Sequence, residues 1–150
     1  MKPIRRDELT TAYMTALQEA EAALEQSYCP HSGLSVAAGL VLSSGEVITG
    51  INYESVSYGL TLCAERSAIT RAQVEGKIPD VVGLVLSACN RESEKDGQPL
   101  TPCGACRQWL LELSNRLGRD IPVYSFWKGT DSGLAGTVRE LLPSAFESFQ

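Results

Sequence analysis

The sequence predicts an α/β fold with three layers, α/β/α, around a mixed sheet of about five strands. Segments with apolar residues at helical spacing alternate with short apolar runs that are typical of strands. Their order is helix, strand pair, helix, strand, helix, strand pair, helix, which suits helices packed on both faces of one sheet. The chain has 150 residues, 43% of them hydrophobic. That is enough for one core, so we expect a single domain, 1–150.

The first half of the chain predicts a helix and a hairpin. Apolar residues recur at helical spacing behind Asp7, a suitable N-cap, so a helix is expected over about 7–26. Two segments, 36–42 and 46–52, flank Ser43-Ser44-Gly45 and predict a β-hairpin.

The second half predicts the remaining elements. A helix that begins at Cys63 should end near Gly76, because glycine favours the position after a helix. The apolar run 81–89 predicts a buried strand, and a polar loop, 90–100, follows it. After these come a helix that opens at Cys103, two strands at 121–127 and about 134–138, and a short terminal helix.

Charge and composition exclude several classes of function. The net charge is −5 and the sequence pI is about 4.9, which argues against nucleic acid as a partner because phosphate contacts need clustered Lys and Arg. The polar N-terminus and the absence of a long apolar run predict a cytoplasmic protein without a membrane segment. Five cysteines in that setting indicate metal ligands plus spare thiols, Cys29 and Cys89, instead of disulfides.

Two motifs carry the chemistry: Cys-Ala-Glu at 63–65 and Pro-Cys-Gly-Ala-Cys at 102–106. They supply three thiolates and one carboxylate. Structural zinc is normally closed by four protein ligands, so three ligands predict a catalytic ion with one position open. Residues three apart share a helix face, which suits two ligands, whereas residues two apart do not. We therefore expect Cys63, Cys103 and Cys106 to bind one zinc ion per subunit, with Glu65 as a base beside it.

Two arginines stand next to these motifs. Both cysteine segments appear where helices open, and the helix dipole there lowers thiol pKa and favours thiolates. Three thiolates leave net negative charge on a divalent ion. Arg66 and Arg107 each follow the base or a ligand, and we expect them to offset that charge through hydrogen bonds.

Cys two residues before Glu, followed by Pro-Cys-x-x-Cys, is a signature of zinc-dependent deaminases that act on nucleobases. From about residue 13 to 146 the chain resembles the small homotetrameric cytidine deaminases. The resemblance implies the cytidine deaminase-like fold and a homotetramer with shared active sites. The blocks that carry it are Tyr28-x-Pro30-x-Ser32, Asn52-x-Glu54, 57–66, 102–108 and 141–146.

The resemblance also implies roles for residues outside the zinc motifs. Asn52 and Glu54 would hold the ribose 3′-hydroxyl, and Ala64 would present backbone groups to the pyrimidine. Tyr58 and Phe146 would approach the active site of a neighbouring subunit. Without the resemblance, Asn52 and Glu54 could be a solvated strand end, and Phe146 could belong to the core.

The entry loop departs from the family's pattern. Relatives usually carry Phe where this chain has Leu34, which removes one aromatic face from the substrate site and leaves more room. The lost stacking is worth about 1 kcal/mol. His31 lies in the same loop and is not needed as a ligand, because the fourth zinc position must stay open. The polar loop 90–100 is also a few residues longer than usual.

The implied reaction is hydrolytic deamination of cytidine or 2′-deoxycytidine to the corresponding uridine with release of ammonia, a step of pyrimidine salvage in which Glu65 moves protons. Two alternatives stay open. One is a deaminase of modified cytosine nucleosides such as blasticidin S; Leu34 leaves room for them, while Asn52 and Glu54 argue for a free ribose. The other is a non-catalytic, zinc-stabilised relative, against which Glu65 argues.

Overall fold

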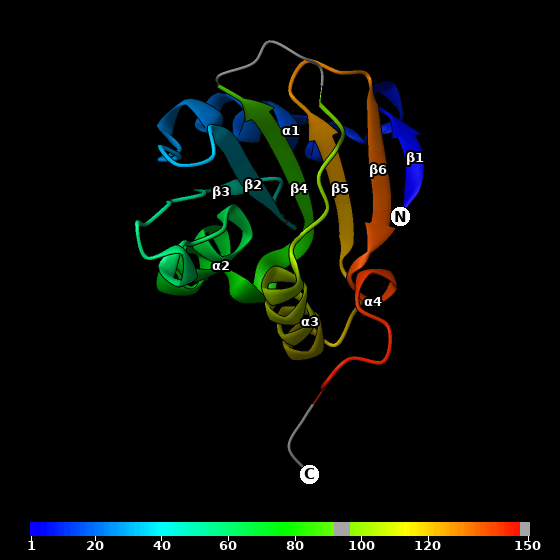
Figure 1. Cartoon of the computed structure of the whole chain (residues 1–150). Coiled ribbons are helices and arrows are strands. Elements are labelled where there is room, and N and C mark those ends of the chain that lie inside the picture. The colour runs from blue at the N-terminus through cyan, green and yellow to red at the C-terminus, as the bar shows by residue number, and fades with distance from the viewer. Residues whose placement is uncertain (92–96, 148–150) are drawn as a thin grey trace.

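A computed structural model describes residues 1–91 and 97–147 and shows an α/β fold built on one mixed sheet (Figure 1). Six strands lie in the order β1-β6-β5-β4-β2-β3. β4 and β5 run parallel, and the other neighbouring pairs run antiparallel. The strands are β1 (Lys2–Arg5), β2 (Leu34–Leu42), β3 (Val47–Ile51), β4 (Val81–Asn90), β5 (Pro122–Trp127) and β6 (Ser132–Thr137).

Helices cover both faces of the sheet, which confirms the predicted three layers (Figure 1). On one face lies α1 (Thr11–Ala23), whose Ala16 and Leu17 pack against Phe126. On the other face lie α2 (Ala64–Val74), α3 (Gly104–Leu117) and α4 (Val138–Leu141), over a larger apolar core. Single 3-10 turns join these elements: η1 (Arg6–Glu8), η2 (Leu24–Gln26), η3 (Tyr58–Leu60) and η4 (Ile78–Asp80).

The connections explain the strand directions. β2 and β3 form the predicted hairpin, in which Gly45 has a φ of 88° that suits glycine. β4 and β5 are parallel because the chain between them crosses over through α3, as parallel strands require. In the described ranges, no helix combines the length and the apolar character needed to cross a membrane.

The sheet has six strands where the sequence predicts five. The additional strand is β1, which pairs with β6 from Lys2 opposite Ala135 to Arg5 opposite Ser132. Its sequence, Lys-Pro-Ile-Arg, is largely polar and its residues are mostly exposed, so it lacks the apolar alternation by which strands are found. An edge strand needs only backbone pairing on one side, and it tolerates the proline.

The first helix begins later than predicted. Asp7 is not its N-cap, because Arg6–Glu8 form the separate turn η1 and the cap of α1 is Thr10. The Asp7 carboxylate pairs with Arg5, 3.1 Å away. The helix also ends at Ala23, and the predicted remainder to Gln26 is the turn η2. Of the polar loop 90–100, residues 92–96 lie outside the described part of the chain.

Candidate active site

The two cysteine motifs meet where α2 and α3 begin. Cys63 and Cys103 are the N-caps of these helices, and both have extended backbone conformations. The carbonyl oxygen of each accepts the first helical hydrogen bond, from Ser67 at 3.0 Å and from Arg107 at 2.9 Å. Both segments therefore open helices, as the sequence predicts, and the helix dipoles converge on the sulfurs.

The three predicted ligands form one compact cluster. The sulfurs of Cys63, Cys103 and Cys106 all lie within 4.8 Å of one another, and those of Cys63 and Cys103 are 3.8 Å apart. Zn–S bonds of about 2.3 Å in a tetrahedral site place two sulfurs about 3.8 Å apart. The thiol set therefore fits a zinc ion. Within residues 1–91 and 97–147, this is the single group of three or more His, Cys, Asp or Glu side chains close enough for one ion.

Charge and hydrogen bonding favour a thiolate at Cys63. Its pKa is lowered to about 5, first by the hydrogen bond with Cys106 and then by that with Arg66, while burial opposes the change. The pKa of Cys106 is raised, because its thiol donates to Cys63 and is buried. The first proton therefore leaves Cys63, and a cation at the centre of the cluster would release the others.

Glu65 is placed beside this cluster but is buried. Its side chain is 4% exposed, at the first turn of α2, two residues from Cys63. Burial raises the pKa of the Glu65 carboxyl, and the Cys63 charge adds to the rise. A carboxyl group whose pKa is raised in this way is suited to accepting and releasing a proton during a reaction.

One cavity of about 220 Å³ collects most of the predicted site. Its wall includes Cys63, Cys103 and Glu65 from the two cysteine motifs. The other predicted residues in the wall are Leu34, Asn52, Glu54 and Ala64. The wall also contains residues to which the sequence analysis gave no role: Ser32, Val36, Thr61, Leu86, Leu100 and Thr101.

A sequence signal exists for part of this additional wall. Leu100 and Thr101 directly precede Pro102, so a segment that enters the metal motif necessarily passes the cavity. Thr61 likewise precedes Cys63 by two residues. For Val36 and Leu86, which lie on β2 and β4, the sequence shows only ordinary strand residues.

Asn52 is buried and anchors the start of β2. Its Oδ1 accepts from the Ser27 hydroxyl at 2.5 Å and from the Val36 N–H at 2.8 Å, and its Nδ2 donates to the Leu34 carbonyl at 2.9 Å. An amide nitrogen has two hydrogens. Among the described residues the structure gives this nitrogen one acceptor, so one donor remains at the cavity wall.

Glu54 is also buried, at 9% exposure, and it holds the entry loop. Its carboxylate accepts from the Ser32 hydroxyl and from the backbone N–H of His31 at 2.8 Å. These bonds, that of the Ser32 hydroxyl foremost, lower the pKa of the Glu54 carboxyl and keep it ionised. The idea of a solvated strand end is wrong for both Asn52 and Glu54.

The two arginines differ in what they contact. Arg66 donates to the Cys63 sulfur at 3.6 Å. Arg107 donates to the carbonyl oxygens of Pro102, at 2.7 Å, and Leu141, at 3.1 Å. These hydrogen bonds hold the backbone before Cys103, whereas the bond from Arg66 reaches a sulfur directly.

Tyr58 and Phe146 lie on the surface, outside the described lining of the cavity. Tyr58 is 74% exposed and meets the His31 ring edge-on, with the centroids 5.8 Å apart. Phe146 is 58% exposed, and its carbonyl oxygen accepts from Gln108 at 2.9 Å. The possibility that Phe146 belongs to the core is therefore wrong.

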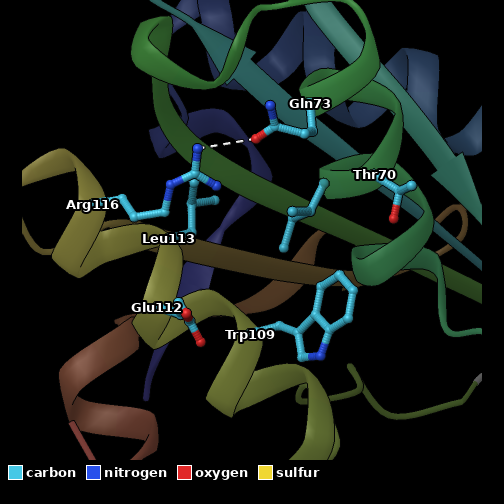
Figure 2. Close-up of a pocket in the computed structure, with 7 residues that line it drawn as sticks. Thr70, Gln73, Trp109, Glu112, Leu113 and Arg116 are labelled. Carbon is cyan, nitrogen blue, oxygen red and sulfur yellow. Dashed lines mark hydrogen bonds between the residues drawn. The ribbon is translucent and has the colours of Figure 1, made fainter. Parts of the chain in front are cut away.

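A second hollow, of about 460 Å³, lies between α2 and α3 and contains none of the predicted site residues. Figure 2 shows Trp109 and Leu113 of α3 facing it, with Arg116 bonded across to Gln73 of α2 at 3.0 Å. Trp109 is 44% exposed. The hollow is a mainly apolar groove on the helical surface.

Known proteins share these features. The cytidine and deoxycytidylate deaminase zinc-binding region matches residues 10–117. A cytidine deaminase from Halalkalibacterium halodurans is 42% identical over 135 residues, which cover 87% of this chain and 90% of the relative. A probable cytidine deaminase from Dictyostelium discoideum is 38% identical and is covered to 80%, again over 87% of this chain.

Solved structures agree with the sequence matches. The crystal structure of cytidine deaminase from Burkholderia pseudomallei superposes with a TM-score of 0.77 at 33% identity, over 92% of this chain and all of that one. The cytidine deaminase from Mycobacterium tuberculosis gives a TM-score of 0.67 at 29% identity. The match to the zinc-binding region includes all three clustered cysteines and Glu65. The chain therefore belongs to the zinc-binding cytidine and deoxycytidylate deaminase family.

Proposed function

We propose that this protein catalyses the hydrolytic deamination of cytidine and 2′-deoxycytidine to uridine and 2′-deoxyuridine, with release of ammonia. One observation carries the proposal. A single cavity is lined by Glu65 and two cysteines of the cluster, Cys63 and Cys103, and also by Asn52 and Glu54. It thus offers a reaction centre for a base and polar groups for a sugar, which are the two parts of a nucleoside.

Cys63, Cys103 and Cys106 are the residues that would hold zinc. When bound there, zinc supplies a Lewis acid that lowers the pKa of a water molecule toward neutrality. Arg66 supports this arrangement because its hydrogen bond keeps the Cys63 sulfur charged.

Glu65 moves both protons of the reaction. It accepts a proton from the attacking water and delivers it to ring N3, while the water oxygen forms a bond to C4. It then takes the remaining proton of that oxygen and gives it to the exocyclic amino group. The C4–N bond breaks, ammonia leaves, and the new oxygen becomes the carbonyl oxygen of uridine. One carboxylate serves both transfers because it stands beside C4, and its burial excludes bulk water.

Asn52 and Glu54 orient the nucleoside. The remaining donor of Asn52 and an oxygen of Glu54 suit the ribose 3′-hydroxyl, which can accept from the first and donate to the second. Ala64 and Leu34 also line the cavity; Ala64 offers backbone groups to the base, and Leu34 covers it with an aliphatic side chain. Because Asn52 and Glu54 bind the ribose hydroxyl, the site favours cytidine over modified nucleosides whose sugar has lost this free hydroxyl.

Ammonia release by zinc-loaded protein with cytidine tests the proposal, with Glu65→Gln as the matched control. We expect release from the wild type and loss of at least two orders of magnitude in the variant, which should keep its zinc. Near-normal turnover of Glu65→Gln would contradict the role of Glu65. Zinc-loaded wild type that releases no ammonia from either nucleoside would contradict the proposed substrate.

The protein also acts as a homotetramer with shared active sites. Tyr58 and Phe146 support this, because both aromatic side chains are exposed and outside the cavity lining of their own chain, so a neighbouring subunit can cover them. The groove between α2 and α3 supports it too. Glu112 and Arg116 stand one turn apart beside Trp109, so two copies of α3 related by a two-fold axis can pair each Glu112 with the partner's arginine.

Two experiments test the assembly. Light scattering should give the mass of a tetramer for the wild type and a smaller mass for Trp109→Glu, while Lys2→Glu on β1 leaves it unchanged. Mixing Glu65→Gln chains with Phe146→Ala chains tests the sharing of sites. Hybrids contain sites with Glu65 from one chain and Phe146 from another, so activity should exceed the average of the two variants. Activity at that average would contradict shared sites.

We place the protein in the cytoplasm and its reaction in pyrimidine salvage. All five cysteines are free thiols, and the cluster needs thiolates to bind metal, which a reducing compartment maintains. Cell fractionation followed by immunoblotting checks the location. Accumulation of labelled cytidine in cells that lack the protein, relieved by the wild type and not by Glu65→Gln, checks the use of the reaction.

A further inference from the structure

The strand β3 comes unusually close to the helix α2 at Gly50. Gly50 lies on the buried face of β3, two residues from Ile48, which belongs to the core beneath α2. A Cβ atom built on Gly50 would lie 2.2 Å from the backbone nitrogen of Ala68 and 2.5 Å from the carbonyl oxygen of Ala64. Real side-chain atoms do not approach backbone atoms this closely, so only glycine fits here without a shift.

The two atoms that meet Gly50 belong to one hydrogen bond. In an α-helix the N–H of a residue donates to the carbonyl oxygen four residues earlier, so Ala68 and Ala64 close the first turn of α2. Backbone atoms in a helix cannot rotate aside as a side chain does. A Cβ at position 50 therefore has to push the first turn of α2 outward, by about 1 Å to reach van der Waals distance.

The helix contributes small residues to the same contact. Ala64, Ala68 and Ala72 are spaced four apart on α2 and are fully buried. On the neighbouring strand β2, Ala38 pairs with Gly50 and is also fully buried. The distance between α2 and the sheet is thus set by backbone contact instead of by long side chains that could adapt.

This contact lies directly under the metal cluster. Ala64 stands between Cys63 and Glu65, so an outward shift of the first turn carries both away from the sheet. Cys106 lies on α3 and Cys103 is its N-cap, whereas the three atoms nearest to a Cβ at Gly50 all belong to Ala64 and Ala68 of α2. The shift would change the 3.8 Å separation between the Cys63 and Cys103 sulfurs. Zinc–ligand distances vary by only about 0.2 Å.

We propose that Gly50 is a positioning residue for the metal site, and that its missing side chain sets the distance between the cysteine of α2 and the two cysteines of α3. Gly50 acts through the backbone of Ala64 and Ala68 and touches neither metal nor substrate. The inference rests on the proposed function only in that the three cysteines bind zinc.

Gly50→Ala tests this, with Gly39→Ala as the matched control. Gly39 lies on β2, and a Cβ there would meet the Ala16 carbonyl oxygen of α1 at 3.0 Å, on the face of the sheet away from the metal. Zinc affinity is measured by competition with a chromophoric chelator, and ligand geometry by the absorption spectrum of the Co²⁺ form. We expect Gly50→Ala to lose 10- to 100-fold in zinc affinity, as variants beside metal ligands do, and to show an altered Co²⁺ spectrum. Gly39→Ala should change neither by more than a few-fold.

Circular dichroism of each metal-free variant separates this effect from loss of the fold. If Gly50→Ala does not fold, Ala68→Ser adds one atom to the helix residue whose backbone nitrogen and Cα lie nearest to Gly50, with Ala20→Ser on α1 as its control. Ala68→Ser should then bind zinc more weakly than Ala20→Ser. Wild-type zinc affinity and an unchanged Co²⁺ spectrum in the folded variant would overturn the proposal. Zinc binding is measured without nucleoside, so a wild type that binds zinc but releases no ammonia would count against the proposed reaction alone.

Discussion

The guanidinium group of Arg66 donates to the Cys63 sulfur at 3.6 Å and to the Thr61 carbonyl oxygen at 2.8 Å. Both acceptors precede α2 in the chain, so one side chain fixes the backbone that enters the helix and places positive charge beside a thiolate. Three thiolates around a divalent ion carry excess negative charge, which a hydrogen-bonded cation reduces. Arg66 therefore both fixes the conformation of the chain before α2 and reduces the negative charge of the metal site.

Replacing Arg66 should weaken zinc binding. We expect Arg66→Gln to lose about tenfold in zinc affinity, because the variant removes the charge, and Arg66→Lys to fall between it and the wild type. Chelator competition measures this. Arg71→Gln, on the same helix and paired with Glu75 at the surface, is the control. Equal affinity in Arg66→Gln and Arg71→Gln would show that Arg66 does not support the metal.

Removal of the metal should lower both activity and thermal stability. A metal that binds only the folded chain adds stability that grows with its concentration, about 4 kcal/mol at a thousand times Kd. The midpoint of thermal unfolding should therefore rise with free zinc in the wild type and in Cys89→Ser. It should not rise in Cys103→Ser. A midpoint independent of zinc in the wild type would contradict binding by the cluster.

The entry loop should respond to acid through Glu54. Because hydrogen bonds lower its folded pKa below the unfolded value of about 4.3, the unfolded chain binds the proton more readily. This contribution to stability is complete above the unfolded pKa and is lost as pH falls through the folded pKa. Ser32→Ala removes the main donor and should reduce the acid-dependent loss.

Urea unfolding between pH 3 and pH 7 measures that difference. The free energy of unfolding should fall less steeply with acid in Ser32→Ala than in the wild type, and Glu54→Gln should show the same reduction. Glu19→Gln, on an exposed position of α1, should behave as the wild type does. A Ser32→Ala slope equal to that of the wild type would mean that the Ser32 hydroxyl does not stabilise the Glu54 carboxylate.

Leu34 should limit the affinity for small pyrimidine nucleosides. Leu34→Phe adds an aromatic face to the cavity wall, and stacking worth about 1 kcal/mol corresponds to roughly a fivefold lower KM for cytidine. The same variant should disfavour cytidine analogues with bulky groups on the exocyclic nitrogen, because the ring takes up space. Steady-state kinetics with both substrates, and with Leu34→Ala as the control that only enlarges the cavity, test this. A KM for cytidine that rises in Leu34→Phe would place Leu34 away from the base.

Much of the fold could be predicted because its elements leave local patterns. α2 and α3 begin where cysteine and proline stand before apolar periodic segments, and the hairpin of β2 and β3 turns at a glycine with positive φ. β1 leaves no such pattern, because its pairing with β6 joins residues more than 120 positions apart. The predicted start of α1 at Asp7 is wrong because Asp7 pairs with Arg5 instead of capping the helix.

Part of the candidate site could likewise be predicted from the sequence, and part could not. The cysteine cluster and Glu65 follow from motif spacing, since residues a few positions apart on a helix have fixed relative directions. The contact between Arg107 and the Leu141 carbonyl oxygen could not be predicted, because it joins side chain to backbone across 34 positions. The close approach of Gly50 to α2 could not be predicted either, because a lone glycine in a strand does not indicate which element packs against it.

The polar character of β1 has a consequence for the behaviour of the protein in concentrated solution. β1 lies at one end of the strand order, so its outer edge carries backbone groups that another chain could pair with. Lys2, Pro3 and Arg5 are exposed there; charges repel a second such edge, and proline offers no N–H to it. The polar composition of β1 makes the strand difficult to predict from the sequence. The same composition protects this edge of the sheet from pairing with other chains and thus from aggregation.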